Sequence, residues 1–169
     1  MLNYQFFPKT KQMPEHLQRV VNAFQNIYTS IDSEHENLKS NEVLAVVAPQ
    51  LSEISFNVEC QGNKISVPVL FGRNGAVAKS FEADAYHKDT KTVIEVEAGR
   101  ALTNHQFLKD LFEACMMNEA EYLVIAVRNL YVTKSSANKD FEKIEQFFDT
   151  LYQSDKLQLP LSGILLIGY

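Results

Sequence analysis

Hydrophobic residues in the first part of the chain recur with helical spacing. An apolar stripe that begins after Pro14 predicts a first helix, and a second helix is expected from about Ser40 to Leu51. Ser40 or Asn41 would cap this second helix, whereas Pro49 could end it early. The first ten residues show no clear period and are interpreted as an arm. The stripe of the first helix consists of Leu17, Val20, Val21, Phe24, Ile27 and Ile31.

The middle of the chain alternates between apolar and polar residues, which is typical of strands with one buried face. Pro68 interrupts one of these segments and indicates a strand at a sheet edge. Turns rich in glycine and asparagine at 61–64 and 72–75 separate the segments. The expected strands cover residues 56–60, 65–71, 80–87 and 92–98.

Further along the chain the hydrophobic period returns to that of helices. Thr103 and Gln106 have the spacing of a capping box, which predicts a helix from Thr103 to Asn118. The run 121–127 is almost wholly apolar and predicts a central strand buried on both faces. The remaining expected elements are a polar loop at 133–138, a helix after it and an apolar strand at 163–168. The residues expected to face the core from these two helices are Leu108, Leu111, Phe112 and Cys115, then Phe141, Ile144, Phe147, Phe148 and Leu151.

This order of elements predicts an α/β fold of the α+β type, in which a central mixed sheet is flanked by α-helices. At 169 residues the chain fits a single domain, residues 1–169. Residues 1–36 would form the N-terminal arm and first helix, and residues 37–169 would form the core of the domain.

Composition narrows the function only a little. The apolar fraction of 46% and the charged fraction of 22% are ordinary for a globular protein. No stretch approaches the roughly 20 apolar residues that cross a bilayer, and no secretory pattern is present, so no membrane partner and a cytoplasmic location are expected. Cys60 and Cys115 lack a metal-binding spacing and are interpreted as small buried residues. The net charge of −5 argues mildly against a protein that coats nucleic acid but does not exclude a nuclease.

Acidic residues concentrate on two neighbouring predicted strands. Alternation places Glu82 and Asp84 on one face of the first strand, and Glu95 and Glu97 on one face of the second. A two-residue turn centred on 89–90 would bring Asp84 opposite Glu95 and Glu82 opposite Glu97. Like charges that face each other are destabilising, and a divalent cation that binds carboxylate oxygens is the commonest reason for such a patch. The alternative is that these acids lie on a solvated strand face.

This arrangement resembles the PD-(D/E)xK superfamily of restriction-endonuclease-like nucleases. In that family an Asp ends one strand, Glu-x-Lys stands on the next, and a helix and a central apolar strand follow. Asp84, the segment 95–97, the helix from Thr103 and the run 121–127 follow this order, within a core from about residue 40 to 130. Ala83 stands at the position of the signature proline, and Glu97 stands at that of the lysine, where a minority of active restriction enzymes also carry Glu or Gln.

By this resemblance, Asp84 and Glu95 would bind Mg²⁺ or Mn²⁺ together with the backbone carbonyl of Val96. The cation would lower the pKa of a bound water and neutralise charge on the scissile phosphate. Glu97 could act as a general base or bind a second metal ion. Lys109, which we count among the candidate catalytic residues, could supply the positive charge of the missing lysine.

Other residues could complete such a site. Lys79 is a second candidate for the positive charge, and an acid of the preceding helix often joins these sites, for which Glu53 and Glu42 are both candidates. The candidate nucleic-acid-binding residues are Arg73, Asn74, Arg100, Asn104 and His105. The last three surround the predicted start of a helix, where free N–H groups and the helix dipole favour phosphate. The alternatives are that Arg100 and Lys109 pair with nearby acids, and that the loops at 73–74, 128–129 and 134–139 are ordinary surface loops.

The resemblance therefore implies a Mg²⁺-dependent endonuclease or phosphodiesterase that acts on DNA. RNA is not excluded as a substrate, and a homodimer is also open. One alternative is a catalytically inactive nuclease-like fold that serves as a binding or regulatory protein. Another is an unrelated α+β protein whose acidic hairpin contacts a basic partner.

Overall fold

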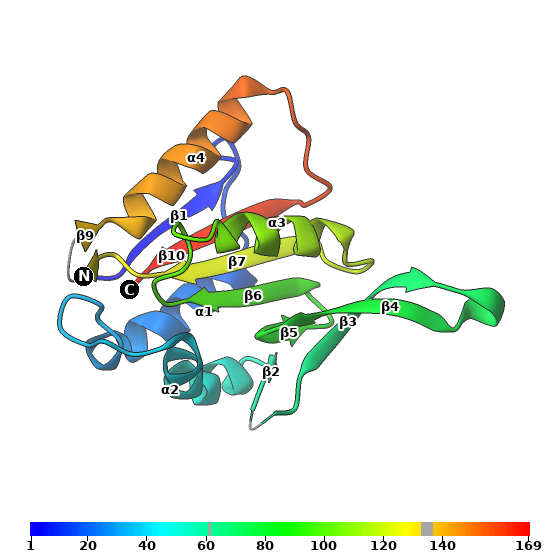
Figure 1. Cartoon of the computed structure of the whole chain (residues 1–169), viewed down its shortest axis with the longest axis horizontal. Coiled ribbons are helices and arrows are strands. Elements are labelled where there is room, and N and C mark those ends of the chain that lie inside the picture. The colour runs from blue at the N-terminus through cyan, green and yellow to red at the C-terminus, as the bar shows by residue number, and fades with distance from the viewer. Residues whose placement is uncertain (61, 133–136) are drawn as a thin grey trace.

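The structure is a computed structural model, and it describes residues 1–60, 62–132 and 137–169. A six-stranded mixed sheet in the order β1-β10-β7-β6-β5-β2 forms its centre, with helices on both faces (Figure 1). The three central strands run parallel, whereas β1, β5 and β2 pair antiparallel with their neighbours. The predicted mixed sheet flanked by helices is confirmed.

The elements follow one another as the hydrophobic pattern predicts, with shifted boundaries. The helices are α1 (Glu15–Asn26), α2 (Ser40–Glu53), α3 (Gln106–Met116) and α4 (Asp140–Ser154), with short 3-10 turns at Tyr28–Ser30 and Arg73–Gly75. The strands of the main sheet are β1 (Asn3–Phe7), β2 (Asn57–Val58), β5 (Ala85–His87), β6 (Thr92–Glu97), β7 (Tyr122–Val127) and β10 (Gly163–Gly168). Two separate two-stranded sheets consist of β3 (Ile65–Phe71) with β4 (Val77–Ala83), and of β8 (Tyr131–Val132) with β9 (Ala137–Asn138).

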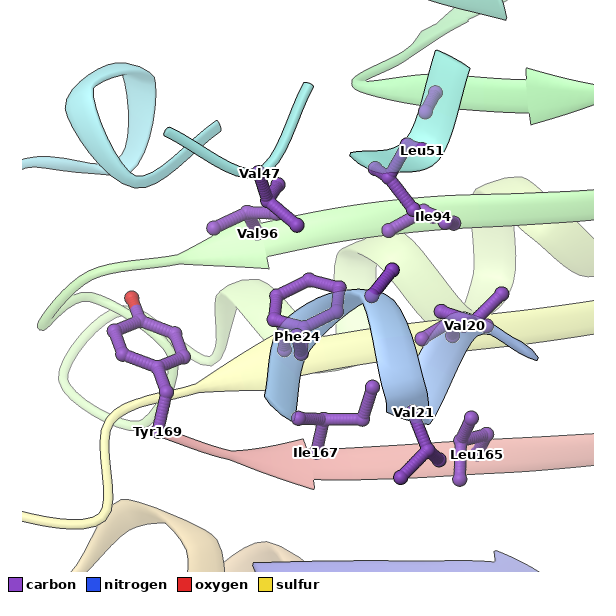
Figure 2. Packing of buried hydrophobic residues seen from close by; sticks show 14 of the residues in the cluster. Val20, Val21, Phe24, Val47, Leu51, Ile94, Val96, Leu165, Ile167 and Tyr169 are labelled. Carbon is purple, nitrogen blue, oxygen red and sulfur yellow. The ribbon is translucent and has the colours of Figure 1, made fainter. Parts of the chain in front are cut away.

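Each face of the sheet has its own hydrophobic core. Helices α1 and α2 cover one face, where Val47 and Leu51 of α2 lie over Val96 and Ile94 of β6, and Phe24 of α1 packs in the same cluster (Figure 2). Helices α3 and α4 cover the other face with a second cluster of buried residues. Because side chains alternate along a strand, Ile94 and Val96 face α2 while the intervening residues of β6 face α3. This alternation directs the acidic residues of β6 toward α3.

The expected single strand at 80–87 is divided at Asp84. Residues before Asp84 belong to β4, which pairs with β3 in a long hairpin, and residues after it belong to β5 in the main sheet. Pro68 lies in β3 where the pairing register shifts, which agrees with its expected edge position. The turn at 72–75 is confirmed, and the turn predicted at 61–64 includes residue 61, which lies outside the described residues.

Three local predictions are wrong. The first residues are not an arm, because β1 pairs with β10 and buries Phe6 and Phe7. Pro49 does not end α2, which continues to Glu53. Proline has no amide hydrogen to donate to the Ala45 carbonyl, but both residues are exposed, so water can reach that carbonyl. Cys60 is exposed rather than buried.

The inward face of α3 also differs from its prediction. Phe112 is exposed, and the buried residues of this helix are Phe107, Asp110, Leu111 and Ala114. Thr103 lies in a turn before the helix, whose N-cap position is taken by His105 in a left-handed conformation without a side-chain cap. The capping box is therefore absent. On α4, Phe147 is 37% exposed and its ring contacts Phe107 and Phe148, whereas Phe141, Ile144 and Phe148 are buried as predicted.

The predicted polar loop at 133–138 lies partly outside the described residues, because residues 133–136 are not described. Residues 137–138 form β9. Within the described parts of the chain, no helix has the length and apolar character that a membrane crossing requires.

Candidate functional site

The register of β5 and β6 decides which acids meet. Ala85 lies opposite Ile94 and His87 opposite Thr92, so the predicted two-residue turn at 89–90 is confirmed and Asp84 continues this register toward Glu95. Both side chains point to the α3 face of the sheet, because opposed residues of an antiparallel pair share a face. The expected pairing of Glu82 with Glu97 is wrong, since Glu82 belongs to β4, lies opposite Ser66 and is exposed.

Asp84 occupies the bend between β4 and β5, where the ladder of backbone hydrogen bonds is interrupted. Its Oδ2 atom accepts the amide hydrogen of Val96 at 2.7 Å, and its backbone carbonyl accepts that of Glu59, also at 2.7 Å. Burial raises the pKa of the Asp84 carboxyl to about 6, an effect that the Val96 hydrogen bond opposes and the charge of Glu59 reinforces. A strand residue directs its N–H and C=O to the same side, so the Val96 carbonyl also faces the Asp84 edge.

Glu95 and Glu97 extend the acidic group along β6. Burial, together with the charges of Asp84 and then Asp110, raises the pKa of Glu95 well above its usual value. Burial and the same two neighbours raise the pKa of Glu97 to about 8, against the opposing charges of Lys109 and Arg100. Glu97 stands at the end of the strand, and Tyr169 donates a hydrogen bond to its backbone carbonyl at 3.0 Å.

Asp110 is a member of this group that the sequence analysis missed. It lies on the inward face of α3 with only 4% of its surface exposed, and its Oδ2 atom has no hydrogen-bond partner. Gln106 donates to Oδ1 at 3.2 Å, and burial raises the pKa of Asp110 to about 7. The signal in the sequence was its spacing, because Asp110 shares the helical stripe of Phe107, Leu111 and Ala114. A carboxylate on an apolar stripe needs a partner that the stripe does not supply.

A cleft of about 560 Å³ adjoins the acidic group, between the start of α2, the end of β6 and the start of α3. The Ser40 side-chain oxygen accepts the amide hydrogen of Ala98 at 3.0 Å and so joins α2 to the segment after β6. Glu42 accepts the amide hydrogen of Lys39 at 2.6 Å and caps the helix. The residues that line the cleft are Lys39, Ser40, Asn41, Glu42, Glu97, Ala98, Arg100 and Gln106.

Of the two helical acids considered as further ligands, the structure brings only Glu42 to the cleft that Glu97 lines. Glu53 lies at the far end of α2 in a separate surface depression with Arg19 and Asn22. The structure therefore places Glu53, which was predicted as a metal ligand, away from the other candidate ligands. Glu42 remains a candidate, because it lines the same cleft as Glu97.

The predicted cationic and polar residues are divided between two places. Arg100 lines the cleft, and Lys109 acts on the charge of Glu97, although its ammonium group also lies 3.4 Å from Glu113. Asn104 and His105 are exposed in the turn before α3. Arg73 and Asn74 lie at the tip of the β3–β4 hairpin, and Lys79 lies on β4 of the same hairpin.

The chemistry of the donor set fits a hard divalent cation. Four carboxylates share one region, and no salt bridge among the described residues involves any of them. No three His, Cys, Asp or Glu side chains of the described chain converge closely enough to hold an ion by themselves. Mg²⁺ usually takes one or two protein carboxylates and completes its shell with water and substrate phosphate. Asp84, Glu95 and the Val96 carbonyl satisfy that smaller requirement in number and type.

Comparison with known protein families and with curated proteins found no match to this chain.

Proposed function

We propose that this chain is a Mg²⁺-dependent endonuclease that hydrolyses phosphodiester bonds of DNA on a restriction-endonuclease-like core. The observation that supports this proposal best is the placement of Asp84 and Glu95 on one sheet face, half-buried and without an ion pair among the described residues. Removing two neighbouring carboxylates from water costs free energy that a bound cation would recover. A merely solvated strand face, the alternative reading of these acids, would leave them exposed.

In this proposal each residue near the cleft has a distinct task. Asp84, Glu95 and the Val96 carbonyl would hold the cation, whose chemistry would be to lower the pKa of a water molecule and to offset charge on the phosphate. Glu97 lies at the family's lysine position and would accept the proton of the attacking water in its ionised form, which predominates above its pKa of about 8. Arg100 and Lys109 position the phosphate by charge, because both already act on the Glu97 carboxyl.

The order of elements around the acids supports the proposed core. Strand β5 runs antiparallel to β6, helix α3 follows β6, and the buried strand β7 lies parallel beside β6. This is the succession that the resemblance implies for the segment 84–127. The helix before the first strand, α2, contributes Glu42 to the cleft wall.

A second function, a nuclease-like fold that binds DNA or a protein without cleavage, is favoured by one observation. Glu97 replaces the family's lysine, and the nearest candidate substitute, Lys109, lies 3.4 Å from Glu113 and is more than half exposed. In that case the site would bind a cation without activating water. Such a protein would retain cation binding and lose nothing when Glu97 is replaced by Gln.

The deciding experiment is a nuclease assay on plasmid, linear, single-stranded DNA and RNA with Mg²⁺ or Mn²⁺. Cleavage by the wild type that is lost in Asp84→Asn and Glu95→Gln supports the endonuclease. Glu53→Gln is the matched control, because this acid lies in a separate depression, and it should cleave as the wild type does. Cation binding without cleavage under all conditions would instead support the second function.

A further inference from the structure

The hairpin of β3 and β4 extends beyond the rest of the molecule (Figure 1). Its root is anchored, because Val67 is buried and the carbonyl of Pro68 accepts the amide hydrogen of Asn118 at 3.0 Å. Every residue from 70 to 79 is exposed by contrast, and this segment is called the hairpin tip below. The tip therefore contributes nothing to the hydrophobic cores and is free to contact another molecule.

The hairpin tip is positively charged in an acidic chain. It carries Arg73 and Lys79 and no Asp or Glu, whereas the whole chain has a net charge of −5. Neither cation takes part in a salt bridge among the described residues. The Lys79 ammonium group lies 5.5 Å from the centre of the Phe81 ring. Cations without an acidic partner on a projecting, acid-free segment are complementary to a polyanion.

The same segment exposes large apolar side chains between its cations. Leu70, Phe71 and Val77 are 61%, 53% and 53% exposed. Phe71 lies opposite Val77 in the hairpin, and Leu70 lies opposite Lys79, with a register shift between these two pairs. A two-stranded ribbon fits the major groove of DNA, and proteins that deform the duplex insert similar side chains between base steps.

The hairpin also begins at the proposed site. Strand β4 ends at Ala83, and the next residue is Asp84. At about 3.3 Å per residue, β4 spans roughly 23 Å, which corresponds to about seven base pairs of duplex. A duplex whose backbone lies at Asp84 can therefore reach the hairpin tip.

We infer that the hairpin tip enters a groove of the duplex DNA substrate, with Arg73 and Lys79 on phosphates and Phe71 against the bases. This inference rests on the proposed function and adds to it that the substrate is double-stranded and longer than the site itself. Duplex DNA of about 30 base pairs is bound more tightly than its single strand or a duplex of about six base pairs.

The test is fluorescence anisotropy with these labelled DNAs and the full chain in EDTA, so that no cleavage intervenes. The double variant R73A/K79A is expected to bind the long duplex about tenfold more weakly, with a salt slope smaller by about two. Phe71→Ala is expected to weaken duplex binding and to leave single-strand binding unchanged. The matched control is K88A/K156A, which removes two exposed lysines outside the hairpin and should bind as the wild type does.

Three further readouts make the outcome decisive. Melting temperatures check that the variants are folded, which is expected because the substituted residues are exposed. The inference is overturned if R73A/K79A and Phe71→Ala bind duplex as tightly as the control K88A/K156A does. It is also overturned if Phe71→Ala changes the oligomeric state, since the tip would then contact a second copy of the chain. Cleavage of a small phosphodiester such as bis(p-nitrophenyl) phosphate with Mn²⁺ should not change in R73A/K79A. If the tip variants bind duplex as the control does while the wild type cleaves the small phosphodiester, the hairpin inference alone fails. If the tip variants bind duplex more weakly but no protein shows cleavage, the proposed catalysis alone fails.

Discussion

The carboxylate of Asp84 takes the place of a main-chain partner for Val96. Its Oδ2 atom accepts the Val96 amide hydrogen at 2.7 Å at the point where β5 has not yet begun. This bond fixes the carboxylate beside β6 and leaves its second oxygen for another ligand. The same residue therefore ends the hairpin, closes a gap in the sheet and faces Glu95.

A bound divalent cation should stabilise the fold through Asp84 and Glu95. Mg²⁺ or Mn²⁺ in excess is expected to raise the melting temperature of the wild type, because a ligand that binds only the folded state stabilises it. A rise of about 2.7 kcal/mol in the free energy of unfolding is expected when the cation is at about 100 times its Kd. Differential scanning fluorimetry measures the shift, and Asp84→Asn and Glu95→Gln should abolish it while Glu53→Gln retains it. An equal shift in all four proteins would exclude this site.

Without a cation, stability should fall as the pH rises from about 6.5 to about 8. The pKa of Glu97 is raised to about 8 and that of Asp110 to about 7, so the folded state binds these protons more tightly than the unfolded state. Since the unfolded state releases these protons first, the stability that the two groups contribute is fully present below their usual pKa values of 4.5 and 3.8 and is lost as the pH rises through their folded values. His16, whose pKa burial lowers, titrates below it.

The check is a series of melting temperatures in EDTA across that range. Glu97→Gln should flatten the decline, and saturating Mg²⁺ should also reduce it, because the cation favours the ionised carboxylates. A melting temperature that rises with pH in EDTA would contradict the assignment of Glu97 and Asp110 as acids without a cationic partner whose pKa values are raised by folding.

Replacing Asp110 should stabilise the protein at neutral and higher pH. Asp110→Asn removes one of the charges that repel Glu95 and keeps an oxygen to accept the Gln106 hydrogen bond. We expect a higher melting temperature at about pH 8 in EDTA by a few degrees, which corresponds to about 1 kcal/mol. Glu36→Gln, which removes a charge from an exposed site, is the control and should change little. Lower stability in Asp110→Asn at that pH would mean that this carboxylate has a favourable partner.

The cleft depends on the bond between Ser40 and Ala98. Ser40→Ala leaves the Ala98 amide without its acceptor at 3.0 Å and is expected to cost about 1 kcal/mol of stability. If the proposed function holds, the same change should reduce cleavage more than it reduces cation binding, because Glu97 and Arg100 flank Ala98. Chemical denaturation and calorimetric titration with Mn²⁺ separate the two effects. Unchanged stability would show that water replaces the hydroxyl.

The sequence predicted the parts of this site that follow from alternation. The faces of Glu95 and Glu97 and the register of Asp84 could be counted from residue spacing, since a strand has a period of two. The division of the strand at Asp84 could not be predicted in this way. Alternation continues through residues 80–87 and does not show that residues before Asp84 pair with β3 while residues after it pair with β6.

Two other features also lay beyond the sequence pattern. Asp110 was overlooked because Phe112 suggested a different inward face, and only the packing of α3 against the sheet selects Phe107 and Leu111. The sequence could not show which end of α2 lies beside the end of β6. In the structure, the hydrogen bond between Ser40 and Ala98 joins the start of α2 to this place, so Glu42 rather than Glu53 lines the cleft.

Diffraction from crystals soaked in Mn²⁺, recorded at a wavelength where manganese scatters anomalously, tests the central claim most directly. We expect one strong anomalous peak within bonding distance of the Asp84 and Glu95 carboxylates, and no such peak in Asp84→Asn. The absence of a peak at this position in well-occupied crystals, or a peak bound only by other residues, would contradict the account.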